Sequence, residues 1–232
     1  MTVGREKIYG PEVAKSSRMK IGIIGCGNIG SAISRHWVEA GHDVILSAKH
    51  RESAERLAAK LGPHAQVGTP EEAARDGEVV LLTIPFGEVP RLAPEIKEAL
   101  KGKIVMDTTN PYPGRDGEIA NTVIHSAMGT GPWTRSKLPG ARIVRAFNSV
   151  HAETFVSQAH RSGDLVGVPL ASDDQEALQV VSKLVQDAGF GPVIVGGLAE
   201  SKRFDVGSPT YGSGASDIEL KERLKIESKK AA

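Results

Sequence analysis

Short apolar runs alternate with segments of helical periodicity along most of the chain. The apolar runs are rich in Val, Ile and Leu and are bounded by polar residues or Gly, which is typical of β-strands. Strands that alternate with helices predict a doubly wound, mainly parallel sheet with helices on both faces, which is an α/β fold. We expect strands at residues 20–24, 43–47, 78–84, 103–107, 142–147, 165–170 and 192–195, and helices at 29–39, 52–61, 71–75, 89–100 and 173–188.

The segment at 173–188 has the clearest helical pattern, because its apolar residues recur with the spacing of one helix face. We expect Ser172 or Asp173 to cap its N-terminus and Gly189 to end it. This helix is predicted to pack in the core and to contribute nothing to a site.

The two ends of the chain differ from the part between them. Residues 1–18 carry scattered charge without apolar periodicity, so we expect an extension outside the core. Residues 19–206 are predicted to form the sheet domain. Residues 207–232 begin with GSPTYGSGAS, which we interpret as a mobile loop, and end in a polar helix at 217–229. Since these segments leave no room for a large helical substrate domain, we expect a single α/β domain.

Composition and charge limit the classes of partner. The chain has 232 residues, of which 40% are hydrophobic, and its 29 Lys and Arg residues nearly balance its 28 Asp and Glu residues. This balance argues against nucleic-acid binding through phosphate neutralisation and favours a small-molecule partner. Cys26 is the single cysteine, which excludes an internal disulfide. Because no apolar stretch of about 18 residues occurs and no apolar segment follows the N-terminal charges, we expect neither a membrane span nor a secretion signal, and we expect a cytoplasmic protein.

The strongest motif is Gly25-Cys-Gly-Asn-Ile-Gly30, which lies between the strand at 20–24 and the helix at 29–39. Glycines at this spacing permit a tight turn at Gly25, close approach of a pyrophosphate at Gly27, and close helix–strand packing at Gly30. The pyrophosphate would lie at the helix N-terminus, where unpaired N–H groups favour an anion. The motif therefore predicts a dinucleotide site, with a glycine turn without a ligand as the alternative. We interpret its cysteine as a packing residue and not as a redox thiol.

The end of the second strand bears on the choice between NAD and NADP. An acidic residue there would accept hydrogen bonds from a free ribose 2′-hydroxyl, but the sequence reads SAKHR. Lys49, His50 and Arg51 can bind a 2′-phosphate, and Ser47 can donate a hydrogen bond to it. A solvated helix start is the alternative interpretation. Because cations are poorly placed at a helix N-terminus unless an anion joins them, we favour NADP(H).

Further candidate residues follow the later strands, at the carboxyl edge where open α/β sheets bind ligands. Proline stiffens a turn and asparagine can hydrogen-bond a carboxamide or a ribose, although ordinary turn chemistry is the alternative at each position. The candidates are Thr83, Ile84 and Pro85 at the end of the strand at 78–84, Thr108 and Asn110 after the strand at 103–107, and Ala146, Asn148, Val150 and His151 at the end of the strand at 142–147.

The chain resembles the NADPH-dependent reductases of the deazaflavin coenzyme F420 in five ordered motifs, GIIGCGNIGSAI, VILSAKHR, VVLLTIP, DTTNPY and VRAFNSV. The reductase domains of six-transmembrane metalloreductases are similar too. The resemblance runs from about residue 19 to residue 198. It implies a single Rossmann domain, usually a homodimer, that passes a hydride from NADPH to a planar deazaflavin or flavin. Carried over by position, it implies pyrophosphate contacts at Asn28 and Ile29, 2′-phosphate contacts at Ser47, Lys49 and His50, and contacts near the nicotinamide at Ile84, Asn110 and Asn148.

Two departures from the family pattern concern the acceptor side. His151 stands where the family usually has a small residue or proline, and the polar segment FDVGSPTYGSGASDIELKERL replaces an apolar C-terminal helix. His151 is the one residue near the predicted hydride site that can donate a proton, although a histidine at a helix start is more commonly a surface residue. Phe204 and Tyr211 can fold over an acceptor ring as a lid or pack locally. The predicted acceptor site comprises Asn110, Asn148, His151, Phe204 and Tyr211.

The residues leave three functions open. Hydride transfer between stacked rings needs orientation more than acid or base groups, which fits a sequence without metal, hydrolase or dehydrogenase motifs. An NADPH-binding sensor or scaffold without turnover is the second, and the polar C-terminal segment favours it. A small carbonyl or imine reductase is the third, disfavoured because such enzymes generally build the substrate site on a helical domain. We expect an NADP(H) oxidoreductase with a deazaflavin or flavin acceptor.

Overall fold

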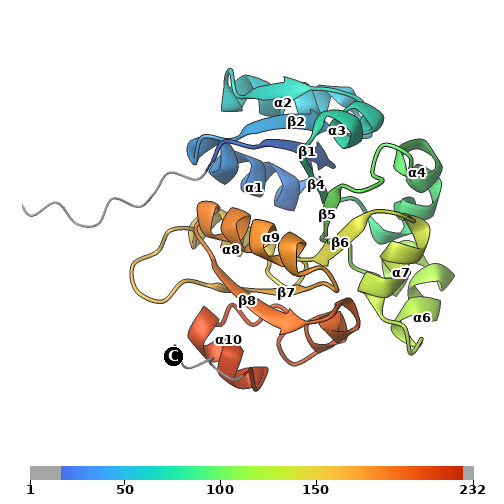
Figure 1. Ribbon diagram of the computed structural model, residues 1–232, viewed down its shortest axis with the longest axis vertical. Coiled ribbons are helices and arrows are strands. Elements are labelled where there is room, and N and C mark those ends of the chain that lie inside the picture. The colour runs from blue at the N-terminus through green and yellow to red at the C-terminus, as the bar shows by residue number, and fades with distance from the viewer. Residues whose placement is uncertain (1–16, 227–232) are drawn as a thin grey trace, which may run out of the picture.

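Eight strands form one sheet between two layers of helices in the computed structural model, which describes residues 17–226 (Figure 1). The strand order is β3-β2-β1-β4-β5-β6-β7-β8, the order of a doubly wound dinucleotide-binding sheet extended by two strands. The predicted fold class is confirmed. The strands are β1 (Lys20–Ile24), β2 (Asp43–Ser47), β3 (Ala65–Val67), β4 (Val79–Leu82), β5 (Ile104–Asp107), β6 (Arg142–Arg145), β7 (Gly167–Ala171) and β8 (Gly191–Gly196).

The predicted helices are all observed, and four further helices lie between residues 113 and 157. Every predicted helix is present within a few residues, while α5 to α8 and the strand β3 were not predicted. The helices are α1 (Asn28–Glu39), α2 (Arg51–Leu61), α3 (Pro70–Asp76), α4 (Val89–Ile96), α5 (Pro113–Asp116), α6 (Glu118–Ile124), α7 (Thr130–Lys137), α8 (Ala152–Ser157), α9 (Gln175–Asp187) and α10 (Asp217–Arg223), with short 3-10 helices η1 (Phe86–Glu88) and η2 (Leu198–Arg203).

The sheet is buried on both faces because its side chains alternate between two cores. In β1, Ile21 and Ile23 pack with α1 and α9 on one face, whereas Ile24 packs with α3 and α4 on the other. All strand pairs are parallel except β6 with β7, whose register pairs Arg145 with Ala171. The carboxyl ends of β1, β4, β5 and β6 therefore meet at one edge of the sheet, where the candidate site residues follow.

The C-terminal segment corrects one prediction, because the stretch at 207–216 is tied to the domain by hydrogen bonds and is not a free loop. The Gly212 amide donates to the Ser149 carbonyl at 2.7 Å, and the Gly167 amide donates to the Ala215 carbonyl at 2.9 Å. After this segment, α10 packs Leu220 against Val193 of β8. The predicted helix at 217–229 is observed at Asp217–Arg223, and residues 227–229 lie outside the described part of the chain. The N-terminal extension predicted for residues 1–18 also lies largely outside it.

The cap of α9 is Asp174, and neither of the two predicted capping residues. The Asp174 carboxylate accepts a hydrogen bond from the Ala177 amide at 2.9 Å. The other two side chains have different partners, since Ser172 Oγ donates to the Ile143 carbonyl and Asp173 accepts from the Leu198 amide. Gly189, at φ 85°, follows the helix end as predicted. Among the described helices, none is both long and apolar enough to cross a membrane.

Candidate active site

The turn after β1 has the geometry that its glycines predict. Gly25 has φ +113°, and a Cβ there would lie 2.2 Å from the Thr83 carbonyl oxygen, so a side chain is excluded on both counts. A Cβ at Gly30 would lie 2.1 Å from the Gly25 carbonyl oxygen. The absence of these two side chains lets the first turn of α1 pack directly on the end of β1.

Gly27 differs from the other two glycines because a Cβ there would meet nothing within 4 Å. Its backbone faces open space at the N-cap position of α1, where no side chain caps the helix and no acidic residue occupies the first turn. Unpaired N–H groups and the helix dipole favour an anion at such a position. These residues fit a dinucleotide pyrophosphate, with room for it at Gly27 and amide donors behind it.

Cys26 is a packing residue of this turn. Burial raises the pKa of its thiol to about 11, although it lies next to a helix N-terminus. Its sulfur donates a weak hydrogen bond to the Ser47 carbonyl at 3.4 Å. The thiol is therefore protonated near neutral pH, which agrees with the prediction from the sequence.

A second cavity lies beside the turn, at the carboxyl end of β2. Gly25, Ser47 and Lys49 line it together with Glu88 and Arg91, two residues that the sequence did not suggest. Lys49 Nζ lies 3.7 Å from a carboxylate oxygen of Glu88, which is also paired with Arg91. The hydrogen bond from Arg91 is the main cause that holds the pKa of Glu88 below its ordinary value, and the charge of Lys49 adds a smaller effect. One carboxylate thus lies between two cations at the predicted 2′-phosphate site.

The other residues predicted for the 2′-phosphate have different surroundings. Ser47 is fully buried, and its hydroxyl donates to the Ile23 carbonyl at 2.9 Å. The predicted hydrogen bond from this hydroxyl to a 2′-phosphate is therefore not available. His50 is the exposed N-cap of α2. Arg51 pairs with Glu55 at 2.9 Å, and neither His50 nor Arg51 lines the cavity.

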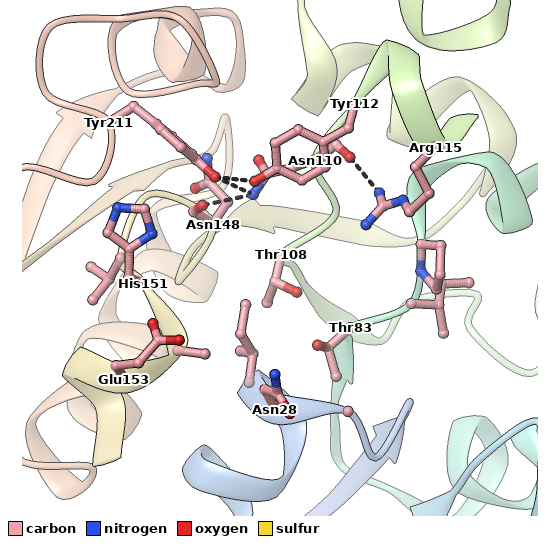
Figure 2. A pocket seen from close by; sticks show the side chains of 16 residues that line it. Asn28, Thr83, Thr108, Asn110, Tyr112, Arg115, Asn148, His151, Glu153 and Tyr211 are labelled. Atoms are coloured by element: carbon pink, nitrogen blue, oxygen red, sulfur yellow. Dashed lines mark hydrogen bonds between the residues drawn. The ribbon is translucent and has the colours of Figure 1, made fainter. Parts of the chain in front are cut away.

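A cleft of about 370 Å³ opens at the carboxyl edge of β4, β5 and β6, next to Gly27 (Figure 2). It brings together most of the residues that were predicted near the nicotinamide and the acceptor. The predicted residues that line it are Gly27, Asn28, Ile29, Thr83, Ile84, Pro85, Thr108, Asn110, Asn148, Val150, His151 and Tyr211, and those that the sequence did not suggest are Tyr112, Arg115, Ala152 and Glu153.

Residues 20–111 match the model of the family described as "NADP oxidoreductase coenzyme F420-dependent". The predicted resemblance to this family is confirmed. The F420-dependent NADP reductase of Methanothermobacter marburgensis is 28% identical over 201 residues, which cover 79% of this chain and 87% of that protein. Metalloreductase STEAP3 of Rattus norvegicus is 26% identical over 186 residues, 80% of this chain but 36% of that protein. A hypothetical protein of Sinorhizobium meliloti shares the fold, with a TM-score of 0.71, 22% identity and coverage of 86% of this chain and 95% of that one.

The matched region contains the glycine turn, the second cavity and the first residues of the cleft. The remainder of the cleft comes from residues beyond this match, which lie at the start of α5, between β6 and α8, in the first turn of α8 and in the C-terminal segment. Figure 2 shows Tyr211 and His151 on one side of the cleft and Tyr112 and Arg115 on the other, with Asn28 at its base. The match to the family model thus covers the nucleotide side of the site, whereas most of the opposite side is built by residues that follow the match along the chain.

A buried ionic network lies behind the cleft. Arg145 and Asp107 are both fully buried, and Arg145 Nη1 lies 3.1 Å from Asp107 Oδ2. Arg145 Nη2 also lies 2.9 Å from Asp205 Oδ1. Burial alone would lower the pKa of Arg145, but Asp205 and Asp107 raise it above its ordinary value, so the guanidinium stays charged. The network joins the ends of β5 and β6 to Asp205, two residues after the end of η2.

Asn110 connects this network to the cleft. Arg145 Nη2 donates to Asn110 Oδ1 at 3.0 Å, while Asn110 Nδ2 donates to the Asn148 carbonyl at 2.8 Å and to the Tyr211 hydroxyl at 3.3 Å. Asn148 in turn donates from Nδ2 to Asp205 at 3.3 Å. Both amides predicted near the nicotinamide are therefore fixed in orientation by the buried charges.

The backbone between β6 and the cleft is strained at Phe147. This residue has φ 58°, a left-handed conformation that costs a non-glycine residue about 1 to 2 kcal/mol. Its fully buried ring contacts Trp37 and Phe155 edge-on, at centroid distances of 6.0 and 5.7 Å. Packing of this ring offsets the strain, and the turn that it imposes precedes Asn148.

His151 lies on the cleft as predicted, at the N-cap of α8, where its side chain makes no capping hydrogen bond. Its ring packs edge-on against Tyr211, with centroids 6.2 Å apart. A Cβ at Gly212 would lie 2.4 Å from His151 Nε2, so the loop approaches the ring closely because residue 212 is a glycine. The structure thus supplies a position for His151, and its proton-donor role stays a prediction.

Two residues that were predicted to lie near the two rings, Phe204 and Ala146, do not line the cleft. Phe204 is fully buried and cannot fold over a ring as a lid, because it packs within the domain and its carbonyl accepts from Asn148. Ala146 is also fully buried, beneath the strained turn. Tyr112 and Arg115 are the main residues that were missed. Tyr112 follows the predicted DTTNP strand end, a signal that was available, whereas nothing in the local sequence marked Arg115.

Proposed function

We propose that this protein is an NADP(H)-dependent oxidoreductase that transfers a hydride between the nicotinamide and the deazaflavin ring of coenzyme F420. The observation that carries the proposal is the cleft, which continues directly from the pyrophosphate position at Gly27 to a wall of aromatic and amide side chains. The similarity to F420-dependent NADP reductases over most of their length supports the choice of acceptor. When bound, NADPH supplies the hydride.

The second cavity supports NADP(H) over NAD(H). Lys49 and Arg91 line it, and no acidic residue stands at the end of β2, where a carboxylate would accept from a ribose 2′-hydroxyl. A 2′-phosphate would bind the two cations and compete with Glu88 for them. We propose Lys49 and Arg91 as the principal phosphate ligands, with His50 and Arg51 contributing at the rim.

The chain's own residues orient the two rings and supply little acid or base chemistry. Asn28 and Ile29 follow the pyrophosphate position, while Thr83, Ile84, Asn110 and Asn148 line the cleft beyond it. Fixed amides and apolar walls suit direct hydride transfer, which depends on orientation and exclusion of water. We propose flavins as a second acceptor class, because a planar ring of the same kind would contact the same walls.

The resemblance to the reductase family also supports two further proposals, on oligomeric state and on location in the cell. We propose that the protein acts as a homodimer and that it resides in the cytoplasm. Sedimentation equilibrium tests the first, because a single species of about twice the 24.6 kDa chain mass is expected. Fractionation of cells tests the second.

Stopped-flow oxidation of NADPH by the purified protein tests the function, with coenzyme F420, riboflavin, FMN, FAD and small carbonyl compounds as acceptors. We expect rapid oxidation with F420. Rapid turnover with a carbonyl compound and none with F420 or a flavin would instead support a carbonyl or imine reductase. NADPH binding without oxidation by any acceptor would support a sensor or scaffold.

A further inference from the structure

Two tyrosine hydroxyls meet across the cleft. Tyr112 follows β5 and Tyr211 belongs to the C-terminal segment, 99 residues away, yet their hydroxyl oxygens are hydrogen-bonded to each other. Figure 2 shows the two rings reaching toward one another from opposite sides, above Thr108. Both residues line the cleft. The contact therefore joins the two walls of the cleft through their hydroxyl groups.

The direction of the hydrogen bonds at this pair is set by the buried network. Arg145 can only donate, so the Asn110 atom that it contacts must be the carbonyl oxygen, and the other atom must be the NH₂ group. The two hydrogens of that group go to the Asn148 carbonyl and to the Tyr211 hydroxyl oxygen. The Tyr211 oxygen is therefore an acceptor from Asn110, and its own hydrogen must find another partner.

Among the described residues, Tyr112 is the only acceptor that the Tyr211 hydroxyl contacts. A half-buried hydroxyl hydrogen left without a partner is costly, so Tyr211 donates to the Tyr112 oxygen. Burial is the main cause that raises the pKa of Tyr211 above its ordinary value, and the hydrogen bond to Tyr112 adds to it. The raised pKa keeps the hydroxyl hydrogen on Tyr211. This arrangement leaves the hydroxyl hydrogen of Tyr112 free, and Tyr112 is 37% exposed at the cleft.

We propose that Tyr112 donates a hydrogen bond to a carbonyl oxygen or ring nitrogen of the hydride acceptor, with its donor direction fixed by the relay Arg145–Asn110–Tyr211. The inference rests on the proposed function, and it makes Tyr112 a specificity-determining contact and Tyr211 a positioning residue. An acceptor without a heteroatom at this place would leave the Tyr112 hydroxyl unpaired and would be discriminated against.

The contact also has a consequence for the rate. In the reaction the C–H bond at the nicotinamide breaks, its electron pair forms a C–H bond on the acceptor ring, NADPH is oxidised and the acceptor is reduced. Negative charge develops on the conjugated heteroatoms of the acceptor before they take up a proton from solvent. A fixed hydroxyl donor stabilises that charge more than it stabilises the neutral ring, and Tyr112 keeps its own proton.

Kinetics of Tyr112→Phe, Tyr211→Phe and the double variant test this arrangement. For Tyr112→Phe we expect kcat/KM for F420 to fall about tenfold to a hundredfold, the range for loss of one donor to developing charge. The dissociation constant for NADPH should stay within about twofold, because the pair lies away from the pyrophosphate and 2′-phosphate sites. Tyr211→Phe should cause a smaller loss, and adding it to Tyr112→Phe should cause almost none, since Tyr211 acts through Tyr112.

The absorption spectrum of oxidised F420 bound to the protein gives a second readout. We expect the ring's visible band to shift between the wild type and Tyr112→Phe, because a hydrogen bond to the chromophore is lost.

Unchanged kcat/KM in Tyr112→Phe, or losses in the two single variants that multiply in the double variant, would overturn the relay while leaving the proposed function intact. Absence of F420 reduction by the wild-type protein would overturn both the proposed function and this inference. The two failures are therefore distinguishable in one set of assays.

Discussion

The two sides of the candidate active site are built in different ways. On the nucleotide side, the pyrophosphate position is built from backbone: Gly25 and Gly30 fit because they have no side chain, and Gly27 leaves space for a ligand. The acceptor side consists of side chains that come from three distant places, Asn110 after β5, Asn148 after β6 and Tyr211 near the C-terminus. The orientation of these side chains depends on a buried arginine that is paired with two carboxylates.

The match to the family model covers the nucleotide side and ends at residue 111, so most of the acceptor side lies beyond it. A dinucleotide makes the same demands on every protein that binds it, and a short glycine turn meets them. An acceptor site can be rebuilt by changing side chains on loops, provided that something rigid holds them. Here the Arg145 network is the rigid part, because it joins β5 and β6 to the segment that carries Tyr211.

Arg145→Met should break the acceptor side and is expected to have the largest effect on stability. The variant leaves Asp107 and Asp205 as buried carboxylates without a cation, which costs about 3 to 5 kcal/mol of unfolding free energy. Urea unfolding measures the loss. Arg142→Met is the matched control on the same strand, where partly exposed pairs with Asp174 and Glu176 should be worth about 1 kcal/mol or less. Equal losses in the two variants would contradict the role given to the network.

Gly30→Ala and Gly27→Ala separate packing from ligand binding on the nucleotide side. The methyl group added at position 30 would overlap the Gly25 carbonyl, so we expect Gly30→Ala to cost about 1 to 3 kcal/mol of stability. Gly27→Ala should leave stability within about 0.5 kcal/mol and weaken NADPH binding about tenfold, because its methyl enters the space for the pyrophosphate. Thermal unfolding and NADPH titration provide the two numbers, and a stability loss in Gly27→Ala equal to that in Gly30→Ala would argue against the ligand space.

Lys49→Ala and Arg51→Ala sharpen the assignment of the 2′-phosphate site. Lys49 lines the cavity and Arg51 does not, so Lys49→Ala should weaken NADPH binding about tenfold and spare NADH. Arg51→Ala should change NADPH affinity by about threefold or less, since its exposed side chain is already paired with Glu55. The wild type should prefer NADPH by at least about tenfold. Similar affinity of the wild type for both cofactors would contradict the assignment.

Asp174→Asn tests the charge at the N-cap of α9 and has the smallest expected effect. The Arg142 hydrogen bond, helped by the Ala177 amide, lowers the pKa of Asp174 to about 2 from an ordinary value of 3.8. A folded-state pKa below the unfolded value means that its stabilisation is present above about pH 4 and is lost as pH falls toward about 2. Asparagine keeps the cap but not the charge, so we expect a deficit of about 1 kcal/mol at neutral pH that disappears near pH 2. A deficit that does not vary with pH would show that the charge is not responsible.

The parts of the site that could be predicted from the sequence lie next to local sequence signals. The glycine turn and the residues at the ends of β4, β5 and β6 lie next to strong apolar runs, and the structure places most of them on the cleft. The contacts of Arg145 with Asp107 and Asp205 span 38 and 60 residues, and the two tyrosines are 99 residues apart. No periodicity encodes such distances. The same limit explains β3, with three residues, and α5 to α7, which are four to eight residues long, with Gly and Pro inside α5 and α7.

Phe204 shows the opposite limit. An aromatic residue in a polar segment was predicted either to close over a ligand or to pack locally, and the segment folds back on the domain and buries that ring completely. Tyr211, in the same segment, reaches the cleft because its hydroxyl has partners there. Composition alone could not separate the two residues, whereas the hydrogen-bonding capacity of the tyrosine could have favoured it.

The most direct test of the account is the fate of a deuterium label. NADPH carrying deuterium at the transferable position of nicotinamide C4 is mixed with the protein and oxidised F420, and the reduced deazaflavin is analysed by mass spectrometry. Direct transfer within the cleft predicts that the label appears on a ring carbon of the reduced deazaflavin, because carbon-bound hydrogen does not exchange with solvent. Reduced deazaflavin without the label, or label released into water, would contradict the account.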